Sequence, residues 1–173
     1  MRVLRLALRL GLFIMVFSFI ACTSTKFLIW KDKTYQGHPQ KILVINSFRN
    51  SDTRKIFEDE FVKALKDRRV DSVMRYAVID DPVTLDKNAI VAQAKEVGAD
   101  TVLITRPVST RMGVGGTVDM FINTQTDAYD MKSNRLILIA SAETEIPDGK
   151  ASSRQIHTFV DDLVNQMSQL GLF

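Results

Sequence analysis

Alternating apolar runs and amphipathic segments in the first half of the domain constrain its fold most strongly. Lys41–Asn46 and Thr101–Thr105 have continuous apolar centres, as in strands that are buried on both faces. Val70–Ile79 has apolar side chains at alternate positions and is predicted to be a third strand. Apolar residues at helical spacing over Thr53–Arg68 and Leu85–Val97 predict a helix between successive strands. Because such crossovers are right-handed, we expect a parallel core sheet.

Capping residues mark the ends of the two predicted helices. Asn50, Ser51 and Asp52 supply capping side chains for the start of the first helix. Thr84 is the expected cap of the second helix. Gly98 is expected to end that helix, because the residue after a helix often adopts the left-handed backbone conformation. The polar face of the first helix is predicted to be solvated, and it comprises Glu58, Asp59, Lys63, Lys66 and Asp67.

The second half predicts a hairpin and a final helix. Arg106–Gly116 is expected to be a flexible stretch. Thr117–Asp130 and Leu136–Glu145 are predicted strands, joined by a turn at Lys132-Ser133-Asn134. Ser152–Leu170 has the spacing of a helix. The expected fold is therefore α/β (α+β), a mixed sheet with a parallel β-α-β-α-β core followed by a β-hairpin and a C-terminal helix.

Residues 1–21 are predicted to be a signal peptide. The segment begins with three arginines and no acid, and Leu10–Ala21 then forms an apolar run of the length found in secretory signals. Phe19-Ile20-Ala21-Cys22 resembles the lipobox of bacterial lipoproteins, with phenylalanine in place of the usual leucine. The resemblance implies cleavage before Cys22 and lipid on its sulfur. The alternative is an uncleaved signal anchor with an incidental cysteine.

The mature chain divides into a lipidated tether and one domain. Residues 22–40 are expected to form the tether and a short first strand around Lys26–Lys31, on which Trp30 packs against the domain. Residues 41–173 are expected to form a single α/β domain that faces the periplasm. Two or more acyl chains give stable anchoring, and the bacterial modification carries more than one. Thr23 stands where aspartate favours inner-membrane retention in enteric bacteria, so the outer membrane is expected.

Composition excludes several kinds of protein. Cys22 is the only cysteine, so the domain has no internal disulfide and must be stabilised by packing. The signal arginines account for the net charge of +3, because the rest of the chain has 20 basic and 20 acidic residues. The basic excess therefore gives no argument for nucleic-acid binding. Only His38 and His157 remain as soft metal ligands, so neither a structural zinc nor a cofactor is predicted.

Several segments together resemble a family of small, poorly characterised bacterial lipoproteins. They are Trp30-Lys31-Asp32, Tyr35-Gln36-Gly37, Lys41-Ile42-Leu43-Val44, the run from Arg54 to Phe61, and Gly98-Ala99-Asp100. More distantly, the order of elements is similar to that of three envelope assembly domains. These are the periplasmic domain of the curli secretion lipoprotein, the N-terminal domain of the Tol-Pal translocation protein, and the lipoprotein activators of peptidoglycan synthases. Such a likeness implies a fold and not a function.

The glycine cluster is the main candidate for a functional loop. Gly113, Gly115 and Gly116 lack the Gly-Lys-Ser/Thr of a phosphate loop and the strand-to-helix setting of a dinucleotide site. They are expected to form a mobile hairpin. In the functional alternative, Arg106 and Arg111 flank a loop that contacts a partner or a lipid headgroup.

Three functions remain open. Adjacent acids in turns and on helix faces do not form a general acid–base pair, so an enzyme is not expected. The leading hypothesis is a non-enzymatic, lipid-anchored envelope protein that binds another envelope component as an assembly or regulatory adaptor and does not bind nucleic acid. The first alternative is a periplasmic carrier of an apolar ligand, with the glycine-rich loop as a lid and a cavity of roughly a few hundred Å³. The second is a hydrolase, which requires a cleft that gathers Asp80, Arg106 and His157.

Overall fold

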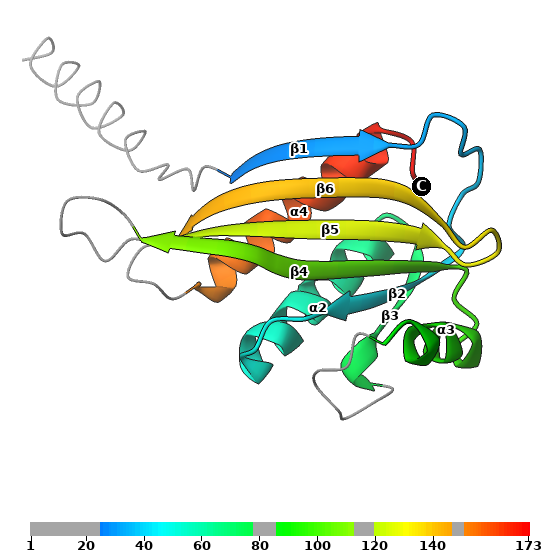
Figure 1. Cartoon of the computed structure of the whole chain (residues 1–173), viewed down its shortest axis with the longest axis horizontal. Coiled ribbons are helices and arrows are strands. Elements are labelled where there is room, and N and C mark those ends of the chain that lie inside the picture. Colours follow the sequence, from blue (N-terminus) through cyan, green and yellow to red (C-terminus); the bar gives the residue numbers. More distant parts are fainter. Residues whose placement is uncertain (1–24, 78–85, 113–119, 147–150) are drawn as a thin grey trace, which may run out of the picture.

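A six-stranded mixed sheet organises the chain (Figure 1). The computed structural model describes residues 25–77, 86–112, 120–146 and 151–173. The strand order is β1-β6-β5-β4-β2-β3. The strands are β1 (Thr25–Lys31), β2 (Lys41–Asn46), β3 (Asp71–Met74), β4 (Thr101–Met112), β5 (Met120–Asp130) and β6 (Arg135–Ile146). β3 and β4 both run parallel to β2, whereas β5, β6 and β1 continue the sheet by antiparallel pairing. The expected mixed sheet with a parallel core, a hairpin and a final helix is confirmed.

Three helices cover the sheet unequally. α2 (Ser51–Asp67) and α4 (Ser153–Gln169) pack on one face and enclose the larger core. α3 (Lys87–Glu96) packs on the other face, where its core partners come mainly from β2 and β4. Among the described residues, no helix has the length and apolarity needed to cross a membrane.

The helix ends follow the predicted capping chemistry with one correction. The Asn50 side chain accepts a hydrogen bond from the Thr53 amide at 2.8 Å, so this cap is confirmed. α3 begins at Lys87 with Asp86 as its cap, so the prediction of Thr84 as the cap was wrong. Asp86 has a carboxylate that accepts from the Ala89 amide, which fixes the first turn later than the apolar pattern indicated. Gly98 ends the helix with φ +67°.

Glu58 is buried, which corrects its predicted place on a solvated helix face. Its side chain is 1% exposed. Oε1 accepts a hydrogen bond from the backbone N–H of Asn46 at 2.9 Å, and Oε2 accepts one from the backbone N–H of Tyr76 at 3.1 Å. Burial raises the pKa of the Glu58 carboxyl above its ordinary value, although the two amide bonds oppose that shift. One carboxylate therefore joins α2 to the chain at the ends of β2 and β3.

Two strands differ in length from their predictions. Within the segment predicted as a strand over Val70–Ile79, the described residues form a strand at Asp71–Met74 and then a 3₁₀ turn, η2 (Arg75–Ala77). β4 continues to Met112, so the predicted flexible stretch was wrong for residues 106–112. Proline suggests the end of a strand, but it is tolerated at bulges. Pro107 lies at one, because the pairing of β4 with β5 shifts register between Pro107 and Ser109.

Trp30 does not pack on the domain as predicted. Phe27 and Ile29 of β1 pack against the larger core, and Phe27 lies 5.3 Å from the Phe159 ring between centroids. Successive strand side chains point to opposite faces, so Leu28 and Trp30 lie on the face away from α4. Trp30 is 51% exposed there.

Replacing Glu58 by glutamine is expected to lower the free energy of unfolding by about 1–3 kcal/mol. An amide has one oxygen, so it can accept only one of the two backbone bonds and turns its NH₂ group toward the other amide. Urea denaturation measures the change, with Glu96→Gln on the exposed side of α3 as the matched control. Equal stability of the two variants would contradict the structural role of Glu58.

The same variant tests the pKa of Glu58. Because the pKa is raised in the folded state, the folded protein binds this proton more tightly than the unfolded chain does. The stability that this group contributes is therefore present at low pH and is lost as pH rises through the folded pKa. The decrease in free energy of unfolding across that range should be smaller in Glu58→Gln than in the wild type.

Candidate functional site

A groove of about 620 Å³ opens where the chain leaves the carboxyl end of β2. In α/β sheets, ligands bind in crevices outside the carboxyl ends of parallel strands, where the strand order reverses. β2 occupies that position, because β3 lies on one side of it and β4 on the other. The helices that follow β2 and β3 accordingly pack on opposite faces, and the groove lies on the face covered by α2 and α4.

Hydrogen bonds fix the loop that enters the groove. The Asn46 side chain accepts from the Phe48 amide at 2.7 Å, and an Arg54 guanidinium nitrogen donates to the Phe48 carbonyl at 3.1 Å. Glu58 holds the Asn46 amide from the other side. The position of the Phe48 ring at the groove is therefore set by backbone contacts and not by apolar packing alone.

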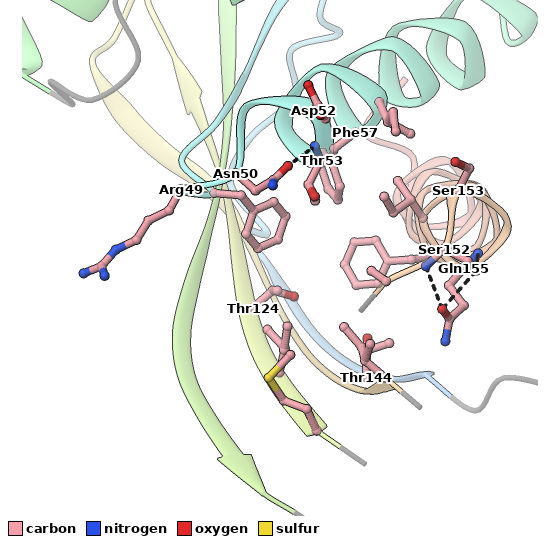
Figure 2. Close-up of a pocket in the computed structure, with 18 residues that line it drawn as sticks. Arg49, Asn50, Asp52, Thr53, Phe57, Thr124, Thr144, Ser152, Ser153 and Gln155 are labelled. Carbon is pink, nitrogen blue, oxygen red and sulfur yellow. Dashed lines mark hydrogen bonds between the residues drawn. The ribbon is translucent and has the colours of Figure 1, made fainter. Parts of the chain in front are cut away.

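The walls of the groove come from segments far apart in the sequence (Figure 2). The first turns of α2 and α4 form two sides, and β5 and β6 form the floor. The Phe57 ring lies 5.7 Å from both the Phe48 and the Phe159 rings, between centroids. The strands add the apolar side chains of Met120, Ile122 and Ile146. Most of the lining is therefore apolar.

Polar groups gather at the rim, where two helices begin. In Figure 2 the Asn50 and Thr53 side lies across the groove from the Ser152 and Gln155 side. Ser152 and Gln155 form a reciprocal capping box at the start of α4. The first turn of a helix presents unpaired amides and a partial positive charge. Asp52 offsets that charge in α2, but the first turn of α4 contains no acidic residue.

Two threonines lie on the floor of the groove. Thr124 is 6% exposed, and its hydroxyl has no hydrogen-bond partner among the described residues. The Thr144 hydroxyl lies 3.3 Å from the Thr25 hydroxyl, and these two residues are paired across β1 and β6. The first described residue of the chain is thus paired with a residue that lines the groove.

On the opposite face of the sheet, no described helix covers β1 and β6. Leu28, Trp30 and Val108 are exposed by 79%, 51% and 60%. Leu28 and Val108 line one shallow depression, together with polar side chains of β5 and β6. Large apolar side chains that are exposed together mark interaction surfaces more often than single ones do.

Arg106 and Arg111 lie on this face within β4, which ends at Met112 just before the predicted glycine loop. An Arg106 guanidinium nitrogen lies 2.8 Å from a carboxylate oxygen of Asp127, which is 2% exposed. Arg111 pairs with Glu143 at 3.0 Å, and its guanidinium carbon lies 3.9 Å from the centre of the Phe121 ring. Both arginines are therefore engaged within the sheet. The three glycines of the predicted loop, Gly113, Gly115 and Gly116, lie outside the described residues.

Two of the three residues proposed for a hydrolase lie on opposite faces of the sheet. Asp80 lies outside the described residues. Arg106 is on the face of the sheet that α3 covers in part, whereas His157 belongs to α4 on the other face. His157 Nδ1 lies 2.8 Å from a carboxylate oxygen of Glu60. Within the described ranges, no three histidine, cysteine or acidic side chains are grouped to hold a metal ion.

Comparison with known proteins shows the class of fold. No family model and no curated protein matches the chain. The structure is similar to the PelC dodecamer from Paraburkholderia phytofirmans, with a TM-score of 0.55 and 11% identity over 82% of this chain and 95% of that one. It is also similar to lipoprotein GNA1162 from Neisseria meningitidis, with a TM-score of 0.52 and 14% identity over 76% and 99%. The chain therefore has a distant fold likeness to lipoprotein-type proteins.

Replacing Arg106 by methionine is expected to lower the free energy of unfolding by about 1–3 kcal/mol, because it removes the cation beside the buried Asp127 carboxylate. Arg111→Met is the matched control, because its partner Glu143 is 41% exposed and stays solvated. Thermal or urea unfolding measures both. Equal losses in the two variants would contradict a structural role specific to Arg106.

Proposed function

We propose that this protein is a non-enzymatic, lipid-anchored envelope protein whose domain faces the periplasm and binds another envelope component. The observation that carries the proposal is the open face of the sheet, where Leu28, Trp30 and Val108 are exposed beside the edge strand β1. The fold likeness to a Neisseria lipoprotein supports membrane anchoring. The fold likeness of this chain to PelC supports an envelope role.

The open face has the chemistry of a protein-binding surface. Tryptophan is enriched among residues whose removal most weakens protein complexes. Ion pairs such as Arg111–Glu143 lie on the same face as the apolar side chains and supply polar groups that would orient a partner. β1 pairs with β6 on one side only among the described residues, so its other edge can accept an added strand.

The anchor would place this surface close to the membrane. Thr25 begins β1 and follows Cys22 by three residues. Three residues span at most about 10 Å when fully extended. Lipid on Cys22 would therefore hold β1 near the bilayer, where its partner would be a membrane-associated component.

Cys22→Ala is expected to abolish labelling by palmitate and to release the protein from membranes, because the sulfur that carries the lipid is absent. Labelling of cells followed by membrane fractionation and gel electrophoresis measures both properties. Thr23→Ala is the matched control, since it leaves the cysteine in place. A wild-type protein that takes up no palmitate, with a variant of unchanged size and membrane retention, would contradict lipidation.

Leu28→Asp is expected to reduce the capture of an envelope component from solubilised membranes by about tenfold, because a charge on this exposed apolar face must be desolvated in a complex. Lys66→Asp is the control, since Lys66 is exposed on α2, which packs on the other face of the sheet. Capture is followed by mass spectrometry, and the mass of the purified protein is measured to detect self-association. Equal capture by both variants would contradict docking on the open face, and a wild type that enriches only itself would contradict a distinct partner.

A second function, the carriage of an apolar ligand, is favoured by one observation. This hypothesis required a cavity of roughly a few hundred Å³, and the groove beside α2 and α4 has about 620 Å³ and a largely apolar lining.

A further inference from the structure

We propose that the groove between the first turns of α2 and α4 binds a membrane lipid with a single acyl chain and an anionic head. The chain would lie along the apolar side chains of Met120, Ile122 and Ile146, and the head would lie between the two helix starts and Thr124. This inference deepens the carrier function and uses the proposed lipid anchor only to explain the source of the ligand.

The floor of the groove suits an acyl chain. The volume of the groove, about 620 Å³, falls within the range of roughly 300–1,000 Å³ that is usual for small-molecule pockets. Met120 and Ile122 lie on the same face of β5 as Thr124, because side chains two apart in a strand share a face. This is the face that α2 and α4 cover, yet both side chains are only partly buried. Phe48 and Ile56, on the opposite wall, are partly buried as well. The described residues therefore leave the larger core incompletely closed at this end, and a bound chain would cover apolar side chains that they leave partly exposed.

The rim suits an anionic head. Two helices of 17 residues each begin at this groove, and the positive end of α4 faces it without an opposing acid, whereas Asp52 offsets the positive end of α2. The first turn of α4 contains no acidic residue that would repel an anion. A second, independent feature is the Thr124 hydroxyl on the floor, which is buried and has no hydrogen-bond partner among the described residues. A polar atom of a ligand would satisfy it.

The position of the groove supplies a source for this ligand. Thr144 lines the groove and pairs with Thr25, the first residue of β1. Because Cys22 is three residues before Thr25, a lipidated protein would hold the groove close to the bilayer surface. A single-chain lipid from that bilayer could enter the groove without diffusing through water.

The test is the binding of cis-parinaric acid, a fluorescent fatty acid, to the purified full chain in phosphatidylcholine vesicles and to its unlipidated Cys22→Ala form. We expect saturable binding at one site in both forms. Ala151→Trp places a large side chain in the groove, and it should weaken binding by about tenfold or more. Val108→Trp adds comparable bulk on the open sheet face and should leave binding unchanged. Circular dichroism of each variant shows that it is folded.

Three further measurements sharpen the test. Oleate should displace the probe at least about tenfold better than the neutral lipid monoolein, and equal displacement would overturn the anionic head. Thr124→Val, which removes the hydroxyl and keeps the shape, should weaken oleate binding and leave monoolein binding unchanged. Mass spectrometry of lipids extracted from protein purified from its own membrane should show a single-chain anionic lipid.

The contrary results are distinct. Absence of probe binding to both forms, or equal binding by the two tryptophan variants, would overturn the proposal. Binding by Cys22→Ala but not by the lipidated chain would overturn it in favour of the protein's own acyl chain as the occupant. None of these results depends on the capture of an envelope partner, so the lipid site and the partner surface can fail separately.

Discussion

The buried carboxylate of Glu58 is the contact on which much of the architecture depends. Its two oxygens accept hydrogen bonds from the backbone N–H groups of Asn46 and Tyr76. Asn46 lies at the carboxyl end of β2, and Tyr76 lies just beyond that of β3. A helix that covers two parallel strands is held at the point where the chain leaves each of them. The same contact fixes the start of the loop to α2, so it also sets the position of the Phe48 wall of the groove. The stability of the fold and the geometry of the groove thus both depend on the Glu58 side chain.

The unequal cover of the sheet explains why the molecule has two kinds of surface. α2 and α4 cover one face but leave an opening where both helices begin. α3 is short and lies over β2 and β4, so Leu28 and Trp30 on β1 have no helix above them in the described structure. The first arrangement gives a concave, apolar site with a polar rim. The second gives a flatter surface suited to another protein.

Much of the fold could be predicted because it depends on local patterns. The apolar runs at β2 and β4, the Asn50 cap and the left-handed Gly98 each specify a structure within a few residues. Glu58 could not be predicted, because a carboxylate beside Asp59 on an amphipathic helix normally faces solvent. Its burial depends on amides that only the folded chain brings to it. Pro107 misled for a similar reason, since the bulge that accommodates it depends on pairing with β5.

The candidate sites depend on contacts between distant segments, and the sequence therefore gave little sign of them. The groove combines the loop after β2 with two strands and a helix from the last third of the chain. No short motif marks such a combination. Arg106 was predicted to flank a partner-contact loop, and the sequence did not indicate its salt bridge to the buried Asp127, which results from the register of β4 and β5. The alternation in β1 did contain the signal for the open face, because it puts Leu28 and Trp30 on the side opposite Phe27.

The central claim is that the open sheet face of a membrane-anchored domain meets another envelope component. The most direct measurement is crosslinking in intact cells from a photoreactive amino acid at position 30, compared with the same group at position 66 on α2, which covers the other face. We expect a defined adduct with an envelope component from position 30 and none of that mass from position 66. Adducts of the same mass and yield from both positions, or none from either, would contradict it.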